Sequence, residues 1–169
     1  MLGFYDNFPE NVHWKEVFNC SLPYKRLQLR LAKTLYEINI SEFKFDEITC
    51  PTIPECSINF EIGIAEDRSF NYIDSNELQR TLNLANKENI TSIDLFWAIR
   101  YYRNTENKRN PLKFDYYLMR LSFDNKIVEF QVLHERGPRY ISPEDLTAFL
   151  IKRINLMSQK RILKPFETT

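Results

Sequence analysis

The sequence predicts an α+β fold in which a single antiparallel sheet of about five strands carries helices on one face. Two observations predict it. Apolar residues recur at helical spacing near both ends of the chain, and long segments between them alternate apolar and polar residues. The 169 residues suffice for one domain of ordinary size, so we expect residues 1–169 to form a single α+β domain. The expected order of elements is α-β-β-α-β-β-β-α.

The first half of the chain predicts a helix, two strands and a second helix. Ser21 and Pro23 are typical of a helix start, and apolar residues follow at helical spacing: Leu27, Leu31, Leu35 and Ile38. Segments 43–49 and 57–66 are expected strands, and the second alternates Ile58, Phe60, Ile62 and Ile64 with less apolar residues. Asp74 or Ser75 can then cap a helix that runs to about Lys87.

Segment 92–103 is ambiguous, because Ser92 and Asp94 could also begin a helix. We expect a strand, since apolar residues alternate without a miss and aromatic residues favour strands. Segment 114–135 predicts a hairpin. With Asp124-Asn125 as its two-residue turn, paired residue numbers sum to 249, which places Arg120 opposite Glu129 as an ion pair and Asp115 opposite His134.

Ser142-Pro143-Glu144-Asp145 predicts the start of the last helix, because serine caps helices, proline favours the first helical position and acidic residues favour the first turn. The expected buried stripe of this helix contains Leu146, Phe149, Leu150, Ile154 and Met157.

The composition excludes several function classes. The three glycines, Gly3, Gly63 and Gly137, lie far apart, which excludes a glycine-rich phosphate loop. Two histidines and three cysteines without a CxxC pair give no support for a metal site or a disulfide framework, and we expect no cofactor. The sequence contains neither a membrane span nor a signal peptide, so we expect a cytoplasmic protein with no membrane partner.

The net charge of zero hides a segregation of charge along the chain. Residues 1–80 contain 8 basic and 13 acidic residues, net −5, whereas residues 81–169 contain 15 basic and 10 acidic residues, net +5. Basic residues and tyrosines cluster in the second half. Cations contact phosphates and aromatic rings stack on bases, so the first hypothesis is a non-enzymatic domain that binds single-stranded DNA or RNA. Its candidate binding residues are Arg100, Tyr102, Arg103, Lys108, Arg109, Arg136, Arg139 and Tyr140.

A family resemblance accompanies this hypothesis. The resemblance rests on Phe114-Asp-Tyr-Tyr117, Phe123-Asp-Asn-Lys126, His134-Glu-Arg-Gly-Pro-Arg-Tyr140 and Ser142-Pro-Glu-Asp-Leu146. Residues 114–150, under a quarter of the chain, resemble the archaeal single-stranded DNA-binding proteins of the ThermoDBP type and their uncharacterised relatives. The resemblance implies an α+β domain whose cleft, with an apolar floor and basic edges, accepts unpaired bases.

Two other function classes stay open. The sheet face away from the core is expected to hold Phe96, Arg100, Tyr102, Tyr116 and Arg120, which could form a platform for nucleic acid. In the second hypothesis, Phe96, Tyr102, Tyr116 and Leu118 bury instead against a protein partner or a second copy of the chain. A hydrolase or nuclease is the lesser alternative, with Asp115, Glu129 or His134 as its residues. The expected faces of Asp115 and Glu129 differ, and we expect neither a catalytic nor a metal site.

Overall fold

Strands contain more residues of this protein than helices do. The computed structural model describes residues 1–49, 55–156 and 158–166, and within them it contains eight strands and three α-helices. In chain order these are β1 (Trp14–Cys20), α1 (Tyr24–Asn39), β2 (Glu42–Lys44), β3 (Cys56–Glu66), β4 (Ser69–Tyr72), α2 (Ser75–Lys87), β5 (Ser92–Thr105), β6 (Lys108–Asp124), β7 (Ile127–Arg136), α3 (Pro143–Leu156) and β8 (Leu163–Pro165).

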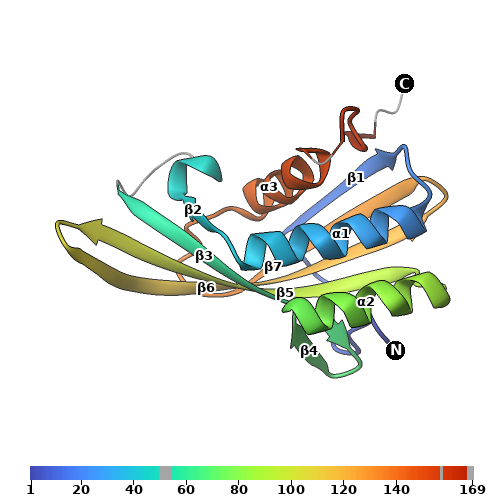
Figure 1. Cartoon of the computed structure of the whole chain (residues 1–169), viewed down its shortest axis with the longest axis horizontal. Coiled ribbons are helices and arrows are strands. Elements are labelled where there is room, and N and C mark those ends of the chain that lie inside the picture. The colour runs from blue at the N-terminus through green and yellow to red at the C-terminus, as the bar shows by residue number, and fades with distance from the viewer. Residues whose placement is uncertain (50–54, 157, 167–169) are drawn as a thin grey trace.

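The strands form one sheet in the order β2-β3-β5-β6-β7-β1-β8, with β4 paired to β3. All of these strand pairs are antiparallel. The three helices lie across one face, with α1 between α2 and α3 (Figure 1). The predicted α+β class, antiparallel sheet and helix-covered face are therefore confirmed. We call the face away from the helices the outer face.

The predicted strand number and element order are wrong. The sheet has eight strands instead of about five, because β1, β4 and β8 were not predicted. Two of them contain only four and three residues. Strand β8 is stabilised by pairing with the distant β1, whereas β4 forms a tight hairpin with β3, the strand before it. Segment 43–49 is also not one strand: after Lys44 the chain turns into a 3₁₀ helix, Phe45–Glu47, where Glu47 accepts a hydrogen bond from the Lys44 amide at 2.9 Å.

The predicted helix starts and the predicted strand at 92–103 are confirmed. The Asp74 carboxylate accepts a hydrogen bond from the Glu77 amide at 2.8 Å, and the Ser142 hydroxyl accepts one from the Asp145 amide at 3.0 Å. Segment 92–103 lies within β5, and its apolar residues are buried in alternation. Met157, the last member of the expected helical stripe, lies outside the described residues.

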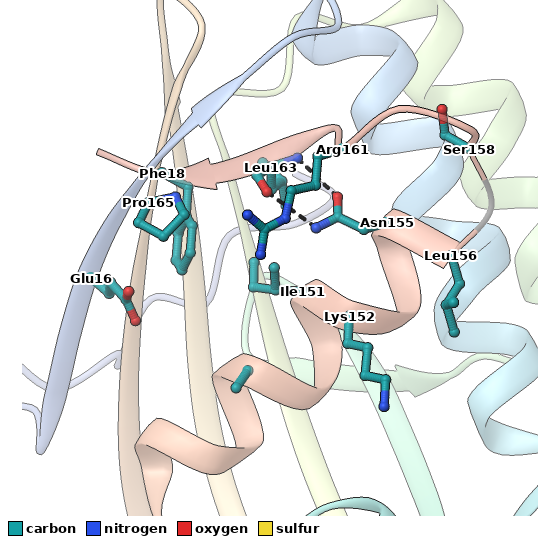
Figure 2. Close-up of a pocket in the computed structure, with 11 residues that line it drawn as sticks. Glu16, Phe18, Ile151, Lys152, Asn155, Leu156, Ser158, Arg161, Leu163 and Pro165 are labelled. Atoms are coloured by element: carbon teal, nitrogen blue, oxygen red, sulfur yellow. Dashed lines mark hydrogen bonds between the residues drawn. The ribbon is translucent and has the colours of Figure 1, made fainter. Parts of the chain in front are cut away.

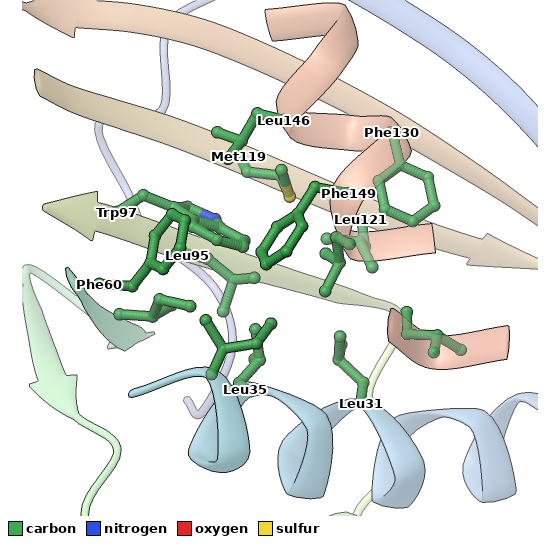
Figure 3. Close-up of a cluster of buried hydrophobic side chains, with 14 of the residues drawn as sticks. Leu31, Leu35, Phe60, Leu95, Trp97, Met119, Leu121, Phe130, Leu146 and Phe149 are labelled. Carbon is green, nitrogen blue, oxygen red and sulfur yellow. The ribbon is translucent and has the colours of Figure 1, made fainter. Parts of the chain in front are cut away.

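The core lies between the helices and the sheet. Figure 3 shows Phe149 of α3 reaching down to Phe60 and Trp97 of the sheet, while Leu31 and Leu35 of α1 point into the same cluster. The rings of Phe149 and Phe60 stack at 5.3 Å between centroids. Cys20 and Cys56 are buried free thiols, and burial raises the pKa of both. Among the described residues, no helix is long and apolar enough to span a membrane.

The register of the β6–β7 hairpin differs from the predicted one. Asp124 pairs with Ile127, so paired numbers sum to 251 and the turn is Asn125-Lys126. Both turn residues have positive φ, 41° and 64°, as a type I′ turn requires. Because the register differs by two residues, each side chain keeps its predicted face. The predicted partner of Arg120 was wrong, however: Arg120 pairs with Gln131 in the register instead of Glu129.

The turn gives a test of this register. Lys126→Gly is expected to raise the free energy of unfolding by about 1 kcal/mol, because glycine adopts positive φ without the strain of a side chain. Urea denaturation measures the change. Lys126→Ala keeps the strain and serves as the control, with no comparable gain expected. A loss of stability in Lys126→Gly would contradict the observed turn, because with Asp124-Asn125 as the turn Lys126 would be a strand residue.

Candidate functional site

Four aromatic side chains form a continuous row on the outer face. The row consists of Phe70 on β4, Phe96 on β5, and Tyr116 and Phe114 on β6, and we call it the aromatic row. Successive ring centroids lie 5.5, 5.6 and 6.2 Å apart. The row follows from strand alternation, because Phe96, Tyr116 and Phe114 are out of phase with the buried side chains of β5 and β6.

The Phe114 end of the aromatic row is the more open one. Phe114 is 39% exposed and lies parallel to Tyr116, with 2° between the ring planes. A hollow of about 440 Å³ adjoins the two rings and is also lined by Lys113, Arg136, Gly137 and Pro138. Among the described residues, neither Lys113 nor Arg136 takes part in an ion pair. The hollow therefore combines two flat apolar rings with two unpaired cations.

Three of the predicted residues, Arg100, Tyr102 and Arg109, lie on the same face as this row. The two arginines form ion pairs, and each lies over an aromatic ring. The Arg100 guanidinium lies 3.0 Å from Glu61 and 5.1 Å from the centroid of the Phe114 ring. Arg109 lies 2.6 Å from Glu42 and 3.9 Å from the centroid of the Tyr102 ring. Both ion pairs are substantially exposed, so each contributes only about 0–1 kcal/mol and weakens with salt.

The other predicted residues are more scattered. Arg103 and Lys108 are exposed near the end of the β5–β6 hairpin, which projects past the helices (Figure 1). Arg139 is exposed and has a positive φ of 60°. Tyr140 packs edge-on against the buried Tyr101 ring at 5.0 Å, on the helix side of the sheet. The structure thus brings Arg100, Tyr102, Arg109 and Arg136 to the outer face and separates Tyr140 from them.

Sequence reasoning missed Lys113, Phe114 and Phe70. Phe114 lies two residues before Tyr116, so alternation alone could have placed both rings on one face. Lys113 belongs to a basic segment but was not selected. Phe70 was harder to find, because the turn Asp67-Arg68 before β4 contains neither glycine nor asparagine, and because its place beside Phe96 also depends on the pairing of β3 with β5.

Arg120, expected on the same face, is not free to bind a ligand. Its guanidinium donates to the buried Asp94 carboxylate at 2.7 and 2.8 Å. The N-terminal segment covers the pair: the Tyr5 amide donates to Asp94 at 2.7 Å, and the Arg120 guanidinium lies 4.3 Å from the centroid of the Phe8 ring. Arg120 therefore fixes the N-terminal segment against the sheet.

Asp115 is the most heavily hydrogen-bonded side chain near the hollow. It is fully buried, and its two oxygens accept hydrogen bonds from the Tyr101 hydroxyl at 2.6 Å and from the amides of Arg139 and Tyr140 at 2.7 and 2.9 Å. Nε2 of His134 lies 2.8 Å from the same carboxylate. The predicted register, with Asp115 opposite His134, is wrong because His134 pairs with Tyr117. The two side chains are nevertheless in contact, and Asp115 anchors the loop that follows β7.

Asp115 and Glu129 lie on opposite faces of the sheet. Asp115 faces the helices, whereas Glu129 lies on the outer face and accepts a hydrogen bond from Gln131 at 2.8 Å. The two carboxylates therefore cannot converge on one cation. Among the described residues, no group of three or more histidine, cysteine or acidic side chains could hold a metal ion.

Comparison with models of known protein families, with curated proteins and with solved structures found no significant match to this chain.

Replacing Asp115 tests its anchoring role. Asp115→Asn is expected to lower the free energy of unfolding by about 3 kcal/mol, because an amide nitrogen cannot accept the hydrogen bonds that one carboxylate oxygen accepts. Urea denaturation gives the value. Asp124→Asn, at the exposed end of the same strand, should stay within about 0.5 kcal/mol of the unaltered protein. An equally small effect at Asp115 would show that its partners find other acceptors.

Alkaline pH gives a second test of this cluster. Burial, the neighbouring phenol of Tyr117 and the Asp115 carboxylate raise the pKa of Tyr101, and burial and Asp115 likewise raise the pKa of Tyr117. A raised folded-state pKa means that the stability is present below the phenol's unfolded value of about 10 and is lost as pH rises above it. Folding stability should therefore fall above about pH 10.

Tyr101→Phe isolates one of these phenols. At pH 8 the variant should be less stable by about 1–3 kcal/mol, because Asp115 loses one donor. The difference from the unaltered protein should narrow as the pH is raised from 8 to about 11, since the variant no longer loses the Tyr101 proton on unfolding. Urea unfolding across this range measures it, with Tyr36→Phe on α1 as the control. If the difference in free energy of unfolding between the two proteins does not change with pH, the pKa of Tyr101 is not raised in the folded protein.

Proposed function

We propose that the protein binds single-stranded nucleic acid on its outer face, without catalysis. The observation that carries the proposal is the aromatic row ending in the hollow of Phe114, Tyr116, Lys113 and Arg136. Unpaired bases offer flat faces to aromatic rings, and each stacked base contributes about 1–3 kcal/mol. Double-stranded nucleic acid buries these faces and does not offer them.

The cations of the hollow supply the second element of such a site. Lys113 and Arg136 line the same hollow as the two rings, so a base against a ring brings its phosphate within the reach of a cation. Cations that stand free of protein carboxylates attract phosphates without first breaking an ion pair. The resemblance of residues 114–150 to ThermoDBP-type proteins implies the same class of ligand.

Arg100 and Arg109 contribute in a different way. Their partners Glu61 and Glu42 reduce the positive charge of the outer face, so binding must either leave these ion pairs intact or exchange the carboxylate for a phosphate. Both pairs are exposed and individually weak, so exchanging the carboxylate for a phosphate costs little free energy. The zero net charge of the chain gives no long-range attraction, and we expect moderate affinity that depends strongly on salt.

The same ion pairs favour a second role, an interface with a protein partner or a second copy of the chain. A face with aromatic rings and neutralised arginines is also suited to burial against protein. Sedimentation at micromolar concentration separates the roles. A dimer that Phe114→Ala dissociates, in a protein that binds no oligonucleotide, would assign the aromatic row to self-association.

Fluorescence anisotropy with a labelled 12-nucleotide oligothymidylate tests the proposal directly. Phe114→Ala is expected to weaken binding about 5- to 150-fold, which corresponds to the loss of one stacked base at about 1–3 kcal/mol. Phe114→Tyr keeps the ring and should retain binding. Arg136→Gln should reduce the slope of log K against log salt by about 0.7, the value for one phosphate contact on a single strand.

The control for charge is Arg26→Gln, an exposed arginine on α1 across the sheet from the aromatic row, which should leave both the affinity and the slope unchanged. Absence of binding at about 50 mM salt, where phosphate contacts are strongest, would refute the proposal. If Phe114→Ala binds the oligonucleotide as tightly as the unaltered protein does, the binding site does not include the aromatic row.

A further inference from the structure

A second concave site lies on the other side of the molecule, between α3 and the strand pair β1 and β8. It is a groove of about 550 Å³ whose walls are mostly apolar: Phe18, Ala148, Ile151, Leu156, Leu163 and Pro165 (Figure 2). This volume falls within the range of about 300–1,000 Å³ that is usual for small-molecule sites. The groove lies on the helix side of the sheet, so it is separate from the aromatic row.

Asn155 of α3 builds one wall of the groove. Its side-chain oxygen accepts hydrogen bonds from the amides of Ile162 and Leu163 at 3.0 and 2.9 Å, and its side-chain nitrogen donates to the Leu163 carbonyl at 3.1 Å. The three bonds hold the start of β8 to the helix. This wall of the groove is therefore already ordered in the free protein, so that ligand binding costs little conformational entropy there.

Two cations stand at this apolar groove. Arg161 extends from the segment before β8 toward Ile151, and Lys152 projects from α3 (Figure 2). Among the described residues, neither takes part in an ion pair. The lining contains one acidic residue, Glu16, which forms no ion pair with either cation among the described residues. An apolar channel with an excess of positive charge is complementary to an amphipathic anion.

We infer that this groove binds a single-chain amphipathic carboxylate, with the acyl chain along the apolar walls and the carboxylate at Arg161. Apolar burial supplies most of the affinity, and it grows with each methylene that the walls cover. Arg161 fixes the orientation of the chain, and the excess of positive charge selects an anion over a neutral molecule.

Isothermal titration calorimetry with octanoate and decanoate, each below its micelle concentration, tests the inference. Each added methylene is expected to increase the affinity about fourfold, the equivalent of about 0.8 kcal/mol. Ala148→Phe places a ring in the groove from an exposed position and should abolish binding without disturbing the core, whereas Ala148→Ser keeps the volume and should retain it. Arg161→Gln should weaken decanoate binding about 2- to 5-fold and leave 1-decanol unaffected.

Lys160→Gln is the matched control for Arg161, because Lys160 is exposed, adjacent in sequence and outside the lining. The inference is overturned by affinities that do not change with chain length, or by decanoate binding that survives Ala148→Phe. The protein could also cosediment with phosphatidylglycerol vesicles. If Ala148→Phe prevents this cosedimentation, the groove binds membrane lipid instead of a free carboxylate. Oligonucleotide binding by Ala148→Phe should stay unchanged, which keeps this test separate from that of the outer face.

Discussion

The buried carboxylate of Asp115 is the constraint on which the arrangement around the hollow depends. A buried carboxylate is costly unless its oxygens accept hydrogen bonds, and here the donors come from β5, β7 and the loop after β7. Satisfying one side chain of β6 therefore fixes three separate segments. Gly137 completes the arrangement: a Cβ there would lie 2.2 Å from the Phe114 carbonyl oxygen, and its φ is +111°. Only glycine allows the loop to pass this close to β6.

The hydrogen bonds of Asp115 on the helix side of the sheet also determine the shape of the proposed site on the outer face. Because Gly137 lies against Phe114 and Asp115, Arg136 and Pro138 are held beside the Phe114 and Tyr116 rings, and the hollow is the space left between them. Asp94 and Arg120 act similarly at the Phe70 end of the row, where they hold the N-terminal segment against the sheet. The aromatic row thus lies between two buried carboxylates whose hydrogen bonds organise irregular backbone. Rings held in this way lose little freedom when a ligand stacks on them.

The sequence was sufficient for several features whose deciding interactions are local. The α+β class, the caps at Asp74 and Ser142, and the strand alternation of β5 follow from residues close together in the chain. The hairpin turn was misplaced by one residue because neither Asn125 nor Lys126 is a glycine, although both adopt positive φ. Strand β4 was also missed, although it forms a local hairpin with β3. Strand β8 and the partner of Arg120 depend on segments far away, β8 on β1 and Arg120 on Asp94 across 26 residues. The basic clusters could be listed from sequence, but which of them share a face is decided by these long-range contacts.

The ion pairs at Arg100 and Arg109 explain how a neutral chain could serve a phosphate ligand. A face of unpaired arginines would attract any polyanion, and it would also repel itself when free. Pairing these arginines with Glu61 and Glu42 removes that repulsion and holds each guanidinium over a ring, at Phe114 and Tyr102. Under the proposed function, Lys113 and Arg136 would carry the initial attraction for the phosphates at the hollow. Selectivity would arise because only a ligand with exposed flat faces gains the stacking energy that offsets the disruption of the outer pairs.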